Sequence, residues 1–501
     1  MGMHIIGIDI GTQGTKAALF NEEMELVCTS FEESKLISPA PGTVWQEADD
    51  LIGSCARTIK ELLEKSGARG TDIAAIGVDG QMAGIMGIAS DGEASTYYDS
   101  WLDMRCGKYM DMMNERAGKR VIALSGGPVT YIHGPKILWW KHEHPEVYAK
   151  TAKFVLPQAY VVGRMTGLDA ENAYFDYTHL HFSCFADNAN KRWSDELLET
   201  FDISPNKFPR IVSPFEVVGK VTREFAALSG LAEGVPVVAG CGDTAASTFG
   251  SGMFRRNMVQ DCAGTASVLC SVVEKFVPDT EYATLVMMRS PVDGLFLPLA
   301  YINGGGMCVR WFRDTLSGKP AASYDELQAE AETVPPGSEG ITFIPHFSGR
   351  VLPNNPFLKG SFLGLDFKHT RGHMYRAVLE AVAYEYRYYL SVLRKLYPND
   401  DFSEMITIGG GAKSPLFNQI KADVLGVNVS TFEMGETALL GSAVIAGCGV
   451  GVLPDYKAPI ERVMRKQAEF KADMQRHKEY APFADAYLKA MDTLTQFYRQ
   501  L

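Results

Sequence analysis

The sequence is poor in the features that mark secreted, zinc-binding or membrane-spanning proteins. Its 501 residues include nine cysteines, and none of these forms a CxxC pair. Scattered thiols in odd number are typical of reduced cysteines, so we expect neither a disulfide framework nor a zinc site. The most apolar window, residues 438–453, is interrupted by glycine and falls short of the roughly 20 residues that cross a bilayer. We therefore expect a core helix there, a cytoplasmic protein and no membrane partner.

Positive charge is scarce as well. Lys and Arg number 48 against 60 Asp and Glu, which gives a net charge of −12. A nucleic-acid backbone needs a basic surface, so the sequence predicts no nucleic-acid partner. Apolar residues make up 46% of the chain, which is ordinary for a globular protein. A chain of this length exceeds what one core supports, so two large domains are expected.

A glycine-containing loop near the start of the chain resembles neither common nucleotide-binding pattern. Residues 6–20 read IGIDIGTQGTKAALF, without the GxxxxGK[ST] or the GxGxxG spacing. The apolar stretch after the loop is too short for a helix, so the segment predicts a β-hairpin. Its backbone N–H groups, with the hydroxyls of Thr12 and Thr15, can face an anion. Taken alone, a plain hairpin with Gly11 and Gly14 at positive φ explains the pattern too.

Two more glycine loops strengthen the anion-binding interpretation. Gly264 and Thr265 follow an acidic strand that contains Asp261, and residues 409–412 precede a helix predicted over residues 415–425. Helix N-termini and glycine loops offer free N–H groups to phosphates or to polar ligand edges. Three such loops, spread over both halves of the chain, suit the two ends of a triphosphate and an adenosine.

Two aspartates supply the chemistry that such a ligand needs. Asp9 would repel phosphates unless a cation lies between them, so it predicts Mg²⁺ bound through water. A strand-end Asp that caps a turn is the alternative. Asp243 stands at a strand-to-helix turn in CGDTAAS, where its carboxylate can accept the proton of an attacking hydroxyl. A plain helix N-cap is equally compatible with its position.

The order of predicted elements repeats. Residues 258–273 read as strand, Gly-Thr turn and strand, like the opening segment, and residues 405–426 read as strand, glycine loop and helix. A helix is predicted over residues 46–67 and a buried strand over residues 73–81. Two similar α/β halves suggest a duplicated domain with a cleft between the copies. We place the boundary near residues 248–257.

Several motifs resemble one family, the FGGY carbohydrate kinases of the actin/hexokinase/Hsp70 superfamily. GSFLGLDFKHTRGHMYRAVLE, residues 360–380, is similar to the family's C-terminal signature. The N-terminal signature is met less well in YIHGPKILWW, which keeps Tyr131 and Lys136. There, His133 stands where a small or hydroxyl residue is usual, and Trp140 replaces an aliphatic residue. The remaining motifs occur in the family's order across nearly the whole chain.

The resemblance implies an α/β fold of two actin-like ATPase (ribonuclease H-like) domains with a central cleft. Residues 1–250 would form the N-terminal domain, with the sugar and the first phosphate loop, and residues 251–501 the ATP-binding C-terminal domain. The resemblance makes Asp243 the catalytic base and gives Asp9 to Mg²⁺. The residues that it gives to ATP are Gly11, Thr12, Gly14, Thr15, Lys16, Gly264, Thr265, Gly306, Gly410, Gly411 and Ala412.

The identity of the sugar is less clear from the resemblance. Residues 346–365 and 100–106 are similar to xylulose kinases, which carry Met-His where this chain has Met82-Ala83, and Asn where it has Thr244. Loss of an imidazole and an amide suits a differently configured or less oxygenated ketose or polyol. Tyr131 lies where glycerol kinases place a substrate-contacting Tyr. The candidate substrate residues are Gln81, Met82, Asp103, Tyr131, Asp243 and Thr244. A surface ion pair of Asp103 with Arg105 is an alternative for that residue.

We therefore expect an ATP-dependent kinase that phosphorylates a hydroxyl of a small open-chain sugar, with a xylulose-like ketose as the first choice. A polyol kinase of the glycerol, erythritol or pentitol type is the alternative, as is a non-catalytic sugar or nucleotide sensor. An Hsp70-like chaperone would need a β-rich domain after the ATPase, whereas residues 466–501 read as a polar helical tail. A homodimer is one expected assembly.

Overall fold

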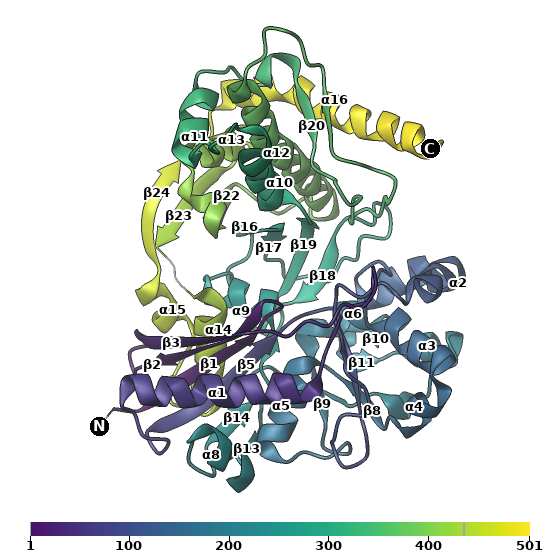
Figure 1. Ribbon diagram of the computed structural model, residues 1–501, viewed down its shortest axis with the longest axis vertical. Coiled ribbons are helices and arrows are strands. Elements are labelled where there is room, and N and C mark those ends of the chain that lie inside the picture. Colours follow the sequence, from purple (N-terminus) through teal and green to yellow (C-terminus); the bar gives the residue numbers. More distant parts are fainter. Residues whose placement is uncertain (1, 434–435) are drawn as a thin grey trace.

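The computed structural model describes residues 2–433 and 436–501, which form two lobes, each built around a seven-stranded mixed sheet (Figure 1). In the first sheet the strand order is β13-β14-β5-β1-β2-β3, and β15 pairs with β5. Its strands are β1 (His4–Ile10), β2 (Gly14–Phe20), β3 (Leu26–Glu33), β5 (Ile73–Gly80), β13 (Val217–Lys220), β14 (Pro236–Val238) and β15 (Cys241–Gly242). Strands β1, β2 and β3 are antiparallel neighbours, which confirms the predicted opening hairpin.

The second sheet has the strand order β18-β19-β17-β16-β22-β23-β24. Its strands are β16 (Val259–Ala263), β17 (Ser267–Ser271), β18 (Val286–Arg289), β19 (Phe296–Ile302), β22 (Glu404–Ile408), β23 (Asn428–Glu433) and β24 (Arg465–Phe470). In both sheets three antiparallel strands are followed by two parallel ones: β3-β2-β1-β5-β14 corresponds to β19-β17-β16-β22-β23. The predicted duplication of the α/β unit is confirmed at the level of topology.

The helices form where periodicity and end signals predict them. In α1 (Ala48–Ser66) apolar side chains at three-to-four spacing are buried, and the helix ends at Gly67 in the left-handed conformation (φ 70°). In α13 (Pro415–Leu425) the side chain of Ser414 accepts a hydrogen bond from the N–H of Phe417, and Gly426 terminates the helix. The predicted caps of α13 are confirmed.

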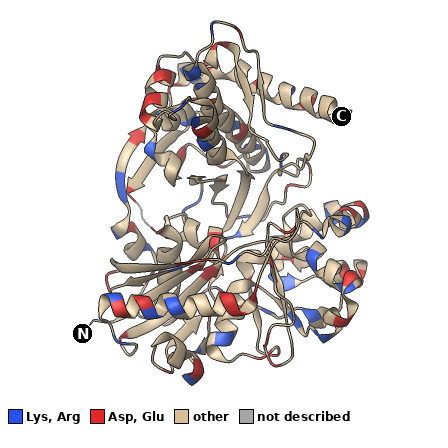
Figure 2. Cartoon of the chain, viewed as in Figure 1, with Lys and Arg blue, Asp and Glu red and all other residues tan. Residues whose placement is uncertain are grey.

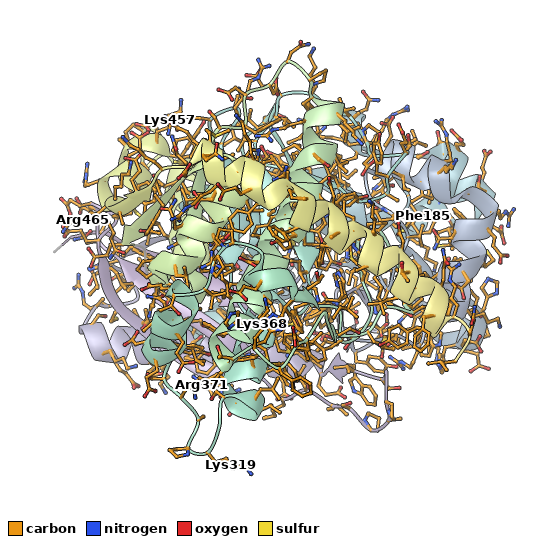
Figure 3. The ribbon with its side chains drawn as sticks, turned by 90° about the horizontal axis from the view of Figure 1, so that it is seen from above. Phe185, Lys319, Lys368, Arg371, Lys457 and Arg465 are labelled. Atoms are coloured by element: carbon orange, nitrogen blue, oxygen red, sulfur yellow. The ribbon has the colours of Figure 1, made fainter. Side chains whose placement is uncertain are left out.

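Helices of the second lobe cover its sheet and tie down the end of the chain. These are α10 (Gly305–Trp311), α11 (Tyr324–Glu332), α12 (Arg371–Leu396), α13 and α16 (Met474–Tyr498). Seen from above, α16 crosses this lobe, and Lys319 lies on a loop that projects away from it (Figure 3). The tail was predicted to be helical throughout, but residues 466–470 pair with β23 as part of β24. The free edge of the sheet supplies hydrogen bonds there that a helix would forgo.

One helix from the second half of the sequence belongs to the core of the first lobe. Helix α14 (Thr437–Gly449) packs against β1, β5 and α9 (Asp243–Gly250). The approach is so close that a Cβ on Gly77 would lie 2.0 Å from the carbonyl oxygen of Ser442. The predicted core helix is confirmed as far as residue 449, where α14 ends, while residues 450–453 lie beyond it. No described helix has both the length and the apolar character needed to span a membrane. The division at residue 250 remains a prediction, since α14 lies beyond it in sequence and with the first sheet in space.

Lys and Arg positions are interspersed with Asp and Glu positions along the chain in both lobes (Figure 2). The elements inserted between β5 and β14 lie beside the first sheet in Figure 1. Those used below are α2 (Gly107–Ser125), α3 (His133–Glu143), α5 (Pro157–Thr166), β9 (Tyr174–Asp176) and the 3₁₀ helix η1 (Tyr177–His179).

Candidate active site

Three carboxylates meet where adjacent parallel strands of the first sheet end. Asp9 of β1 lies opposite Asp79 of β5, and Asp79 lies opposite Cys241 of β15, two residues before Asp243. Carboxyl ends of parallel strands share one edge of a sheet, which is where α/β proteins bind ligands. Asp79 was missed in the sequence, although IGVDG repeats the apolar-run, Asp, Gly pattern of IGIDIG.

The pKa values of the first two carboxylates, Asp9 and Asp79, are both raised above those of exposed aspartates. Burial raises the pKa of Asp9, and the charge of the neighbouring Asp243 raises it further. Burial and the charge of Asp9 also raise the pKa of Asp79. Ser442 of α14 donates a hydrogen bond of 2.5 Å to Oδ2 of Asp79.

Asp9 is suited to a magnesium ion. Its Oδ1 is buried and has no partner among the described residues, and neither has Oδ1 of Asp79. A Cβ placed on Gly11 would lie 3.7 Å from Oδ1 of Asp9, so the carboxylate reaches the first glycine loop. Within residues 2–433 and 436–501, no three His, Cys, Asp or Glu side chains are grouped to enclose a metal on their own. Mg²⁺ is commonly held by one or two carboxylates together with water and substrate phosphates, and Asp9 fits that pattern.

Asp243 is the first residue of α9 and is not its N-cap. The N-cap is Gly242, with extended backbone angles, so the N-cap alternative was wrong. The N–H and Oγ1 of Thr244 both donate to Oδ1 of Asp243, at 2.5 and 3.1 Å. Oδ2 makes no hydrogen bond to a described residue. Burial raises the pKa of Asp243, although the bonds from Thr244 and the nearby His179 oppose the rise.

The first glycine loop is linked to the residues predicted to contact the sugar. The N–H of Gly11 donates to the carbonyl of Gly14 over 3.0 Å and closes the hairpin. Thr12 donates to Oε1 of Gln81 over 3.1 Å and accepts from Nε1 of Trp101 over 2.9 Å. Trp101 is 43% exposed, and it was not among the predicted site residues although it lies in the segment 100–106 that is similar to xylulose kinases. Gln81 therefore connects the phosphate loop to the sugar side.

Two predicted loop residues have other partners. The hydroxyl of Thr15 is buried and lies 2.7 Å from Oγ of Ser54 on α1, so it does not face an anion. The correction follows from strand alternation, which turns the side chain of Thr15 toward the helix layer. Lys16, opposite Asp9 on β2, forms an ion pair with Glu436 just before α14.

The glycine loops of the second lobe come together. The N–H of Met307 donates to the carbonyl of Thr265 over 3.0 Å, and a Cβ on Gly306 would lie 2.0 Å from the carbonyl oxygen of Gly264. A Cβ on Gly411 would lie 2.6 Å from the Cβ of Ala263, directly before Gly264. All three predicted segments therefore share one surface.

The third loop, however, does not open α13 directly. A 3₁₀ helix, η6 (Gly410–Lys413), which includes Ala412, and an extended Ser414 intervene. Gly409, with a φ of 86°, separates β22 from η6, and the extended Ser414 keeps η6 and α13 from forming one continuous helix.

Asp103 is engaged within the protein. Its Oδ2 accepts from the N–H of Val44 at 2.8 Å and from Nε of Arg105 at 2.7 Å, and Oδ1 accepts from the N–H of Arg105 at 3.1 Å. Asp103 is 2% exposed and the Arg105 side chain 20%, so the ion pair that we considered exists but is largely buried and does not lie at the surface. Arg105 also binds Asp99, and Nζ of Lys136 donates to the carbonyl of Asp103 over 2.7 Å.

Two further residues predicted to contact the sugar, Met82 and Tyr131, pack against different parts of the first lobe. A Cβ on Gly242 would lie 2.6 Å from Cε of Met82, so Met82 packs against the residue before Asp243. Tyr131 is partly buried and packs against the start of α2 at Gly107. Tyr98 was missed: its hydroxyl is buried without a described partner and lies against Gly84.

The second lobe has an aspartate at the corresponding strand, but both of its carboxylate oxygens are occupied. Asp261 of β16 accepts hydrogen bonds from Nζ of Lys421 at 2.5 Å and from the hydroxyl of Tyr386 at 2.7 Å. The lysine already neutralises this charge, whereas Asp9 has an oxygen to spare. Of these two aspartates, Asp9 is the one with an oxygen left over for a cation.

This fold and site define a sugar kinase with an actin-like ATPase fold. Residues 4–250 match the N-terminal domain, and residues 262–450 the C-terminal domain, of the FGGY family of carbohydrate kinases. The chain belongs to that family and is an ATP-dependent sugar phosphotransferase.

Individual relatives and structures agree with this assignment. The chain is 30% identical to the xylulose kinase of Escherichia coli (strain K12) over 502 residues, 99% of each chain. Its fold matches a ligand-bound xylulose kinase from Lactobacillus acidophilus with a TM-score of 0.92 at 23% identity, covering 99% of both chains. A gluconate kinase from the same organism matches with a TM-score of 0.91 at 23% identity, covering 100% of both chains. The predicted two-domain actin-like fold is confirmed, and fold similarity alone does not distinguish these substrates.

Proposed function

We propose that the protein transfers the γ-phosphoryl group of MgATP to a hydroxyl of a xylulose-like ketose. The observation that carries the proposal is the cluster of Asp9, Asp79 and Asp243 at one edge of the first sheet, beside the first glycine loop. The 30% identity to a xylulose kinase over 99% of the chain supports the choice of sugar.

In this proposal Asp243 is the general base. Thr244 occupies Oδ1 with two hydrogen bonds, which leaves Oδ2 to accept the proton of the sugar hydroxyl. Burial raises the pKa of Asp243 and so makes its carboxylate a stronger base than an exposed one.

The remaining roles concern the nucleotide. MgATP, when bound, supplies the phosphoryl group and the positive charge that offsets the phosphates. Asp9 would hold the metal through its unpartnered oxygen, and Asp79 lies opposite Asp9 on the neighbouring strand. The first hairpin loop, Gly264-Thr265 and Gly306 bind phosphates, and Gly410 to Ala412 bind the adenosine side.

An uncharged sugar fits the sugar side better than a sugar acid such as gluconate. A carboxylate substrate needs a free cation, and the basic side chains beside Asp103 are engaged by the protein itself. Arg105 binds both Asp99 and Asp103, and Lys136 donates to the Asp103 backbone. The charge surrounding the sugar is therefore already balanced or negative.

A coupled assay of ADP release tests the proposal. The acceptors are D-xylulose, D-ribulose, a hexulose, xylitol, erythritol, glycerol and gluconate, each offered with MgATP. We expect the highest kcat/KM with a pentulose and no turnover of gluconate. Preference for a polyol would move the assignment to the polyol kinases, and a flat result with every acceptor would overturn it. The homodimer and the cytoplasmic location remain predictions.

A further inference from the structure

The turn that carries Asp243 is held by a group outside the three carboxylates. Gly242, the N-cap of α9, has no side chain with which to cap the helix. Its N–H donates to Oγ1 of Thr178 over 3.1 Å, although Thr178 lies 64 residues earlier in the chain. The residue before Asp243 is thus attached to the 3₁₀ helix η1.

The direction of this hydrogen bond is set by a second one. A hydroxyl has one proton to donate, and lone pairs with which to accept. The proton of Thr178 goes to Oδ1 of Asp176, which also accepts the N–H of Thr178 over 3.0 Å. Because its proton is committed to this carboxylate, Thr178 must present a lone pair to Gly242.

Asp176 itself has no freedom to turn. Its Oδ2 accepts from Nε2 of Gln158 at 3.0 Å and from Nδ1 of His179 at 2.8 Å. Asp176, Thr178, His179 and Gln158 are all 0% exposed. A buried carboxylate with four donors can neither rotate nor lose a partner without leaving a polar group unsatisfied. The chain from Asp176 through Thr178 to Gly242 is therefore a rigid support for the turn.

We propose that Asp176 is a positioning residue for phosphoryl transfer. Acting through Thr178 and Gly242, it holds Asp243 so that Oδ2 faces the acceptor hydroxyl. The inference rests on the proposed function, because it takes Asp243 to be the base. Misplacement of a reacting group by about 1 Å can lower turnover roughly 100-fold. The loss should fall on kcat and leave the KM for ATP unchanged, because none of these residues belongs to a glycine loop.

The central variant is Thr178→Val, which removes the hydroxyl at almost unchanged shape. We expect kcat about 100-fold lower with a KM for ATP within about twofold, and recovery of kcat in Thr178→Ser. The matched control is Thr248→Val on α9, which also loses a buried hydroxyl. That hydroxyl donates to the carbonyl of Thr244 over 2.8 Å and takes no part in the hydrogen bonds that connect Asp176, Thr178 and Gly242. That control should keep kcat within a few-fold. The readout is ADP release with the best acceptor among D-xylulose, D-ribulose, xylitol, erythritol and glycerol.

A double-mutant comparison separates positioning from general loss of structure. In an Asp243→Asn background, Thr178→Val should lower the residual rate by no more than about twofold, since both substitutions act on the same step. A further loss of about 100-fold in that background would show that Thr178 acts elsewhere. A Thr178→Val enzyme with wild-type kcat would also overturn the positioning role of Asp176, and it would leave the proposed function standing. If Thr178→Val shows no cooperative unfolding transition, it is not properly folded. The same measurements of kcat and of the KM for ATP are then made on Asp176→Asn, alone and combined with Asp243→Asn. A wild-type enzyme that phosphorylates none of the acceptors would overturn the proposed function and the inference with it.

Discussion

Ser442, on a helix from the second half of the sequence, donates a hydrogen bond of 2.5 Å to Asp79 at the end of a strand in the first sheet. The two residues are 363 positions apart in the chain. The bond connects α14 to the carboxylate that lies opposite Asp9 on the neighbouring strand. Packing of α14 therefore bears directly on the candidate metal site.

Removal of that hydroxyl should destabilise the protein. In Ser442→Ala the buried Oδ2 of Asp79 loses its donor, which costs about 1–3 kcal/mol of unfolding free energy. We expect a lower thermal unfolding midpoint, measured by calorimetry. The control is Ser247→Ala, because Ser247 bonds Thr437 over 2.8 Å at a partly exposed position between α9 and α14. Equal shifts in the two variants would contradict a special role for the bond to Asp79.

Replacement of the proposed base should stop catalysis and spare nucleotide binding. Asp243→Asn keeps the shape of the side chain but removes the proton acceptor, so kcat should fall about 10²–10⁴-fold. Titration calorimetry should give an ATP affinity close to that of the wild type. The assignment of Asp243 as base fails if the variant retains near-native ADP release.

The glycine loops of the second lobe allow a matched pair of substitutions. In Gly306→Ala the new Cβ would lie 2.0 Å from the carbonyl oxygen of Gly264, so the two loops must separate. We expect ATP to bind at least about tenfold more weakly, equivalent to about 1.4 kcal/mol. In Gly410→Ala nothing of the protein lies within 4 Å of the new Cβ, so the loops stay together and the loss of affinity should be much smaller than in Gly306→Ala. Equal affinities for the two variants would remove Gly306 from the nucleotide site.

The buried carboxylate of Glu385 predicts a pH dependence of stability. Burial by itself would raise its pKa, but Arg350, His346 and Tyr487 outweigh burial and lower the pKa to about 2. A group whose pKa is lower in the folded state stabilises the protein above its unfolded pKa, near 4.5, and loses this contribution as the pH falls toward 2. The unfolding free energy should therefore fall as the pH is lowered from about 5 to 3.

Glu385→Gln should flatten this pH dependence and lower stability at neutral pH by about 3–5 kcal/mol, because Arg350 is left buried without its counter-charge. Urea unfolding at a series of pH values measures both effects. Glu339→Gln is the control, since Glu339 pairs with Lys368 at the surface. A slope that persists in Glu385→Gln would assign the acid sensitivity to other groups.

Local signals in the sequence were sufficient for much of the architecture. The turn at Gly11 to Gly14, the Ser414 and Gly426 ends of α13 and the strand-to-helix turn at Asp243 all appear where predicted. Glycine angles, side-chain caps and apolar periodicity act within a few residues, so they can be recognised without knowledge of the fold.

Tertiary structure alone decided which polar groups face the site and which are engaged elsewhere. The pairing of Asp9 with Asp79, the bond from Ser442 and the turning of Thr15 toward Ser54 depend on strand register and on helix packing. Those relations join segments that are far apart in the chain, and no local pattern encodes them. By itself, therefore, the sequence determined the elements and the family resemblance, while packing decided that Asp9 keeps a free oxygen and Asp261 does not.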